Sequence, residues 1–199
     1  MVTKRLSATS RREQILRCAR DVFAAEGFDA ARTAAIARHA GVSEKVLYNH
    51  FASKRDLFLA VVDMVAEQVA AVWTSLATQD LGVHEGIAGH YRLRFVGPDA
   101  PGADGPLFFG RSHGPFSDPV MHERMGRAYR QISDAAAGYL DSLVARGLAR
   151  PDLDTRAAAW NLGAIFRDSD TLRVAYGAPA AREYGLRAIE TFVAGISPR

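Results

Sequence analysis

Apolar residues recur along the chain at intervals of three and four, the spacing that places them on one face of an α-helix. The alternating Val, Ile and Thr runs that mark β-strands do not interrupt this pattern. Glycines, prolines and capping side chains divide it into separate segments. We therefore predict an all-α protein of about nine helices.

The first predicted helix lies between Ser10 and Gly27. Ser10 and Glu13 have the spacing of a capping box, in which each side chain bonds the other residue's backbone amide. Gly27 can adopt the left-handed conformation that ends a helix, and Phe28 is expected to fold back onto the apolar stripe. That stripe consists of Ile15, Ala19, Val22 and Phe23.

Two short helices are predicted next, with a turn at Gly41 between them. Thr33 is expected to cap the first helix and Ser43 the second. Gly41 tolerates a positive φ, and the second helix buries Leu47 and Phe51. Two short helices joined in this way form a helix-turn-helix, whose second helix can enter the major groove of DNA.

The remaining segments are longer. Ser53 and Asp56 have capping-box spacing and begin an amphipathic helix that runs to about Ser75. Val83–Val96 can form another helix, and the Pro- and Gly-rich stretch Gly97–Pro119 is expected to be a loop with one short turn. Further helices are predicted over residues 119–146, 154–177 and 179 to about 196.

The second helix of the helix-turn-helix exposes groups that suit DNA. A lysine can donate to guanine O6 and N7, an amide can pair with adenine, and a carboxylate can accept from cytosine N4. Hydroxyl and imidazole groups suit phosphate oxygens. The exposed positions are Glu44, Lys45, Tyr48, Asn49 and His50.

This segment resembles the TetR family of bacterial regulators. The matching strings are TAAIARHAGVS at residues 33–43 and LYNHFASK at residues 47–54, followed by Leu57. The likeness covers about residues 10–62, and beyond it the chain shares only the family's divergent helical character. It implies an N-terminal three-helix DNA-binding domain (residues 1–56) and a larger helical ligand-binding and dimerisation domain (residues 57–199).

The resemblance also implies roles for single residues. It assigns phosphate contacts to Thr33, Tyr48, His50 and Lys54. It assigns base edges to Glu44, Lys45 and Asn49. With Ser43, these eight residues form the predicted DNA-binding set.

The sequence departs from the family at Lys45, where glycine is frequent, and at Val46, where threonine is frequent. Without that threonine hydroxyl a phosphate contact is lost, so Lys45 either replaces it or reads a base. Two alternatives stay open nearby: Tyr48 can be a core aromatic, and Lys54 can be a solvated helix start.

Aromatic and methionine side chains gather in the middle of the chain. They either pack a helical core or line a cavity for a small apolar or aromatic effector, with Arg94, Arg111 and His113 as candidate polar anchors. The predicted ligand-binding residues are Trp73, Tyr91, Phe95, Phe108, Phe109, Arg111, His113, Phe116, Met121 and Met125.

The last two predicted helices suit a homodimer interface. Small residues at 157–159, 163 and 164 allow a second helix to approach closely, beside Trp160, Leu162 and Phe166. Pairing both helices with their two-fold mates would make a four-helix bundle. Burial within one chain is the alternative.

Charge and composition support a nucleic-acid partner. Residues 1–60 carry eleven Lys and Arg against six Asp and Glu, whereas the remainder carries fourteen against sixteen. A basic N-terminal part on a slightly acidic body suits DNA. The single Cys18 and the lack of a signal-like N-terminus or a run of about eighteen apolar residues predict a cytoplasmic protein without a membrane partner.

Catalytic and metal-binding patterns are absent from the sequence. It has no phosphate loop and no GxSxG, HExxH or CxxC motif, and its six histidines do not have ligand spacing. We therefore expect no enzyme, no metal and no cofactor beyond an unknown small-molecule effector. The predicted function is a ligand-responsive repressor that binds a palindromic operator as a dimer. The alternative is a helical small-molecule-binding or scaffolding protein without specific DNA binding.

Overall fold

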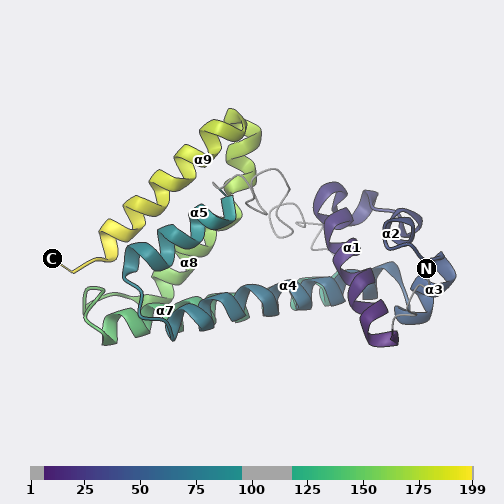
Figure 1. The fold of residues 1–199 in the computed structure, drawn as a ribbon, viewed down its shortest axis with the longest axis horizontal. Helices are drawn as coiled ribbons and strands as arrows, with labels where there is room; N and C mark the ends of the chain where they lie inside the picture. Colours follow the sequence, from purple (N-terminus) through teal and green to yellow (C-terminus); the bar gives the residue numbers. More distant parts are fainter. Residues whose placement is uncertain (1–6, 96–117, 199) are drawn as a thin grey trace, which may run out of the picture.

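The computed structural model describes residues 7–95 and 118–198. Within these ranges the chain is helical and contains no strand, which confirms the all-α prediction. A head formed by the first three helices is joined to a helical body by one long helix, α4 (Figure 1). The described helices are α1 (Ala8–Ala30), α2 (Thr33–His39), α3 (Glu44–His50), α4 (Lys54–Ala77), η1 (His84–Ala88), α5 (Gly89–Phe95), α7 (Pro119–Ala145), α8 (Thr155–Arg167) and α9 (Ser169–Ile196).

Helix α1 begins earlier than the sequence pattern suggests. Ser7 is its N-cap and accepts a hydrogen bond from the amide of Ser10 at 3.1 Å, so the predicted Ser10–Glu13 capping box is wrong. Gly27 has φ 78° and ψ 172°, a glycine conformation that kinks the helix without the expected left-handed cap. The chain then makes one more turn. Phe28 packs against Phe23 and Phe58, as predicted, with ring centroids 6.2 and 5.0 Å away.

Helix α4 leads out of the head. Ser53 caps it and accepts from the amide of Asp56 at 3.0 Å, as predicted. The carboxylate of Asp56 accepts from the amide of Ala52 at 3.1 Å, one residue before the position that a capping box requires. By length and composition α4 could cross a membrane, but half of its apolar window is buried inside the protein, as in a core helix.

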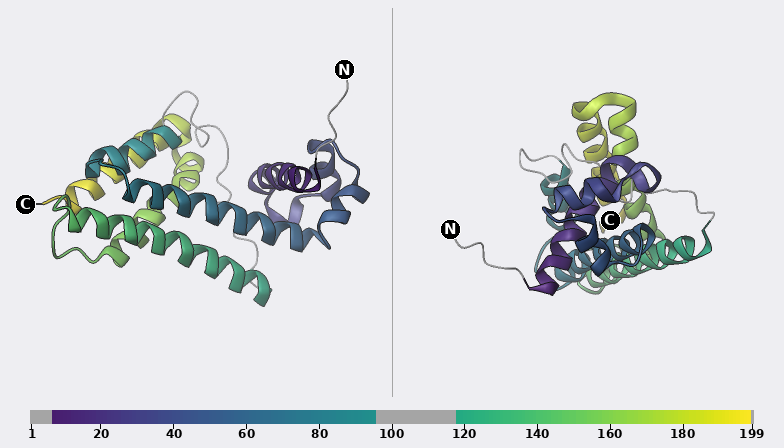
Figure 2. Two further views of the ribbon diagram at one scale, coloured as in Figure 1. Left: turned by 60° about the horizontal axis from the view of Figure 1, so that its bottom comes forward. Right: turned by 90° about the vertical axis from the view of Figure 1, so that its right-hand side faces the viewer.

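The body is built from the remaining helices. The predicted helix at Val83–Val96 is present, but its first turn, η1, is a π-helix. Asp118 caps α7 through the amides of Val120 and Met121, and α7 runs alongside α4 (Figure 2). The predicted helix over residues 154–177 is wrong in one respect, because α8 ends at Arg167 and α9 begins at Ser169. Gly177, with φ 78°, kinks α9 just before Pro179, where a helix start was predicted.

Two apolar clusters make up the core. The head cluster joins α1, α2 and α3 to the first half of α4 and to Met121, Met125 and Ala128 of α7. The body cluster joins the second half of α4 to η1, α5, α7, α8 and α9. Because α4 and α7 contribute to both clusters, the head is packed directly onto the body.

Candidate nucleic-acid interface

The turn between α2 and α3 has the geometry that the sequence predicts. Gly41 has φ 64°, and the oxygen of Ser43 caps α3 by accepting from the amide of Val46 at 3.3 Å. Leu47 and Phe51 are buried. These contacts fix the apolar side of α3 against the rest of the head and leave its opposite side at the surface.

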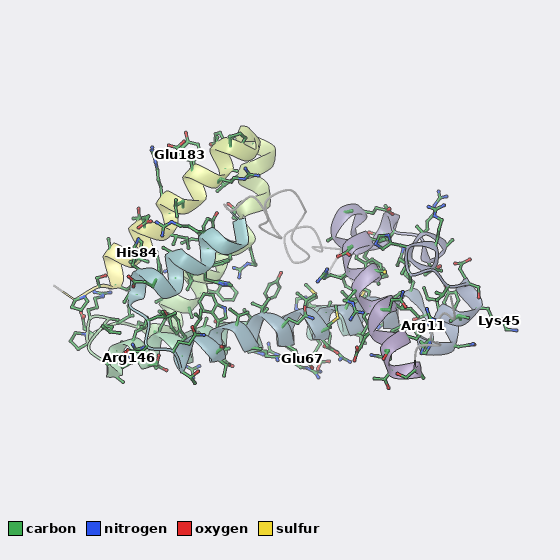
Figure 3. All side chains as sticks on the ribbon, in the orientation of Figure 1. Arg11, Lys45, Glu67, His84, Arg146 and Glu183 are labelled. Atoms are coloured by element: carbon green, nitrogen blue, oxygen red, sulfur yellow. The ribbon has the colours of Figure 1, made fainter. Side chains whose placement is uncertain are left out.

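The surface side of α3 carries the predicted recognition residues. Glu44, Lys45, Tyr48 and Asn49 are exposed, and His50 is half-buried. Tyr48 is 46% exposed, which excludes the alternative that it is a core aromatic. In Figure 3, Lys45 lies at the end of the head that is farthest from the body. This face is therefore accessible to a large partner.

Thr33 begins α2, but it does not cap it. Arg32 occupies the capping position without a side-chain bond, so the prediction that Thr33 is the cap is wrong. The hydroxyl of Thr33 donates to Glu44 Oε1 at 2.7 Å, and Tyr48 OH donates to Thr33 Oγ1 at 3.2 Å. The start of α2 is thus tied to the exposed side of α3.

Lys54 stabilises the head as well as adding positive charge to it. Its Nζ donates to the carbonyl oxygen of Asp29 at 3.0 Å and lies 4.8 Å from the ring centre of Phe28. Lys54 therefore connects the start of α4 to the end of α1. It is not merely a solvated helix start.

The partners of three arginines on the head and on the helices below it were not predicted from the sequence. The guanidinium of Arg12 lies 4.8 Å from the ring centre of Phe51. Arg55 donates to Asp118, the cap of α7, at 2.9 Å, and Arg124 forms an ion pair with Asp63. A basic residue near the N-terminus or a helix start is visible in the sequence, but its partner is distant along the chain.

The body holds an aromatic cluster around Trp73. Its ring centroid lies 5.8 Å from those of Tyr139 and Phe166 and 5.6 Å from that of His90. Tyr91 packs edge-on against Phe166 at 5.4 Å. Of this cluster, only Trp73 and Tyr91 belong to the predicted ligand-binding set.

Two other predicted ligand-binding residues lie outside this cluster. Met121 and Met125 belong to the head cluster, next to the first half of α4. The rest lie outside the residues whose side chains the structure describes: Phe95, Phe108, Phe109, Arg111, His113 and Phe116.

Helix α8 presents an exposed face of small and apolar residues. Ala157, Trp160 and Ala164 are exposed on it, and Trp160 is 55% exposed. The guanidinium of Arg167 lies 5.0 Å from the ring of Trp160 and 5.4 Å from that of Tyr129 on α7. On α9, the exposed rings of Tyr176 and Tyr184 pack together at 5.2 Å.

Comparison with known proteins identifies the N-terminal domain. The family described as "Bacterial regulatory proteins, tetR family" matches residues 15–61. A curated relative, the HTH-type transcriptional activator FasR of Mycolicibacterium smegmatis, is 45% identical over 75 residues. That match covers 37% of this chain and about a third (34%) of the relative's length.

Solved structures resemble the chain over nearly its whole length. A TetR-family regulator from Cytophaga hutchinsonii has a TM-score of 0.78 at 18% identity and covers 98% of this chain and 100% of its own. A regulator from Agrobacterium tumefaciens has a TM-score of 0.77 at 19% identity, covering 96% and 100%. FadR of Bacillus subtilis, in complex with stearoyl-CoA, has a TM-score of 0.69 at 18% identity, covering 92% and 98%. The chain has the fold of these regulators, and residues 15–61 in its head match the tetR family of bacterial regulatory proteins.

Proposed function

We propose that the protein is a transcriptional regulator that binds double-stranded operator DNA through α3. The observation that carries the proposal is the exposed face of α3, held in place by its buried side and by the bonds of Thr33. In this proposal Lys45 and Asn49 reach base edges, and Thr33, Tyr48, His50 and Lys54 hold phosphates. Ser43 contributes by capping the start of α3, and Glu44 lies beside the bases.

A homodimer would bring two such heads to a palindromic operator. The exposed face of α8 and the adjacent part of α9 support this pairing, because small residues there let helices approach closely. We place the DNA-binding domain at residues 1–56 and the ligand-binding and dimerisation domain at residues 57–199. A cytoplasmic location follows from this function.

The effector is proposed to be a small apolar or aromatic molecule that binds the body. The aromatic cluster around Trp73 supports this class of ligand, and FadR, which has the same fold, is complexed with stearoyl-CoA. Effector binding would change the spacing of the two heads and so release the operator. We propose repression by operator occupancy; FasR, the curated relative, is an activator.

Selection of bound duplexes from a randomised pool tests DNA binding. We expect the wild-type protein to enrich one palindrome and to lose affinity steeply as salt rises, because phosphate contacts release counterions. The double substitution Lys45→Ala and Tyr48→Ala should weaken binding to that palindrome by at least about tenfold, since it removes a cation and a hydroxyl from the exposed face. Its melting temperature should stay close to that of the wild type.

Uniformly weak binding to all sequences would contradict the proposal. It would favour a helical small-molecule-binding or scaffolding protein without specific DNA binding. Glu13→Ala, on the exposed side of α1, serves as a control that leaves α3 unchanged.

A further inference from the structure

Two hydroxyls and a carboxylate form a chain of hydrogen bonds across the proposed DNA-binding face. Tyr48 OH donates to Thr33 Oγ1 at 3.2 Å, and Thr33 Oγ1 donates to Glu44 Oε1 at 2.7 Å. A hydroxyl carries a single proton, so each of the two hydroxyls has committed its proton to an acceptor within the protein. Thr33 and Tyr48 are also the residues proposed to donate to phosphate.

We infer that Glu44 is a positioning residue that withholds the Thr33 hydroxyl from phosphate until its carboxylate is released. A phosphate oxygen held by Thr33 needs the same proton that Thr33 donates to Glu44. A carboxylate 2.7 Å from Thr33 Oγ1 would also lie next to any phosphate held there, and the two negative charges would repel each other. The inference rests on the proposed function of α3.

The carboxylate is not needed to cap α3. Ser43 already caps the helix by accepting from the amide of Val46. Glu44 is the first residue of α3, and its carboxylate accepts from Thr33 on α2. Its side chain can therefore leave Thr33 without opening the helix.

The released carboxylate needs a new donor. Glu44 is exposed at the start of the helix proposed to enter the major groove, where cytosine N4 is a donor that a carboxylate can accept from. A DNA sequence that offers such a donor compensates for the hydrogen bond lost to Thr33. Other DNA sequences leave the carboxylate without a donor. Glu44 thus raises specificity by weakening binding to non-matching DNA.

A double-mutant cycle tests this coupling. The variants are Glu44→Ala, Thr33→Val and the double variant, and the measurement is fluorescence anisotropy with a random-sequence duplex. Glu44→Ala should bind this duplex about fivefold more tightly than wild type, a ratio typical of one net hydrogen bond. Glu13→Ala removes one negative charge elsewhere on the head and should give a smaller gain.

In the Thr33→Val background the chain of bonds is already broken. In that background, Glu44→Ala should raise the affinity for the random-sequence duplex only as much as Glu13→Ala does. An equal gain from Glu44→Ala in both backgrounds would mean that charge alone acts and would overturn the inference. Unchanged or weaker binding by Glu44→Ala would overturn it as well.

A duplex selected from a randomised pool gives the second readout. Glu44→Ala should lower the ratio of affinities for the selected and the random duplex, which a purely structural role would leave unchanged. Thermal melting checks that the variants fold, and Glu44→Gln, which keeps the size of the side chain without its charge, replaces any alanine variant that does not. Failure of the wild-type protein to bind either duplex contradicts the proposed function itself, a result distinct from the loss of coupling.

Discussion

Tyr139 lies in the middle of the body with only 1% of its surface exposed. Within the described part of the chain its hydroxyl has no hydrogen-bond partner. A Cβ added at Gly86 would come within 2.0 Å of that hydroxyl oxygen, so glycine is required where η1 crosses the ring. Burial, which disfavours the phenolate, raises the pKa of Tyr139 to about 12 from the ordinary value of 10.0.

We expect Tyr139→Phe to change the free energy of unfolding at neutral pH by less than about 1 kcal/mol, because the lost hydroxyl has no hydrogen-bond partner in the described part of the chain. The wild-type protein should lose stability as the pH rises from about 10 to about 12, since unfolded Tyr139 ionises in this range while the folded residue stays protonated. Urea unfolding of both proteins across this range measures the difference.

Other tyrosines and the lysines titrate in both proteins, so the difference between wild type and variant isolates Tyr139. Below pH 10 the two stabilities should run in parallel. A variant with the same alkaline loss of stability as the wild type would contradict the pKa assigned to Tyr139.

Helix α8 has one face that the described part of the chain leaves exposed. Trp160 is 55% exposed and lies on the same face as Ala157 and Ala164. The opposite face of α8 buries Ala158, Ala159 and Leu162 in the body. An exposed indole among small residues is typical of an interface between proteins.

Trp160→Glu should dissociate the proposed homodimer, raising its dissociation constant at least about thirtyfold, the effect of losing one hot-spot side chain. A charge on this face would be buried against the second copy without a partner. Light scattering coupled to size-exclusion chromatography over a dilution series measures the change.

Val120→Glu is the matched control. Val120 is 48% exposed near the start of α7, where a negative charge suits the helix end. This variant should remain as dimeric as the wild type. Equal masses for Trp160→Glu and wild type at every concentration would place the interface elsewhere.

Across the whole molecule, α4 and α7 connect the head to the body. Arg55 at the start of α4 bonds Asp118 at the cap of α7, and Asp63 of α4 pairs with Arg124 of α7. The second half of α4 carries Trp73 into the aromatic cluster of the body. A displacement of α4 would therefore reach both the aromatic cluster and the proposed DNA-binding face.

An effector of the body should change both the environment of Trp73 and the affinity for DNA. In Trp160→Phe, Trp73 is the remaining tryptophan of the two in the sequence, so its fluorescence reports on the body. A panel of apolar and aromatic compounds, with stearoyl-CoA included, should contain a compound that shifts this fluorescence and weakens binding to the selected duplex.

The same compounds are then titrated into the wild-type protein bound to the selected duplex. This titration shows whether the release of DNA and the change in fluorescence have the same midpoint concentration. A shared midpoint is expected because one bound molecule causes both changes. A panel in which no compound affects both signals would count against an apolar or aromatic effector.

Local patterns in the sequence were sufficient to predict the helix-turn-helix. Its cap at Ser43, its glycine turn and its buried pair depend on residues within a few positions of one another, and such short-range chemistry is visible in a single chain. The exposed face of α3 and the starts of α4, α7 and α8 follow for the same reason. The early cap at Ser7, the break at Asp168 and the π-helical turn η1 did not follow, because packing against distant helices decides between competing local starts and stops.

Only the tertiary structure decided what the predicted residues contact. The sequence placed Thr33, Glu44, Tyr48 and Lys54 on a polar surface, but the bonds of Thr33 to α3 and of Lys54 to α1 join residues that are eleven to twenty-five positions apart. Which groups meet over such separations depends on how the helices cross, and this is set by the apolar clusters of the whole chain. The sequence alone therefore determined a helical protein with a helix-turn-helix, whereas folding decided that Glu44 holds the Thr33 hydroxyl proposed to bind phosphate.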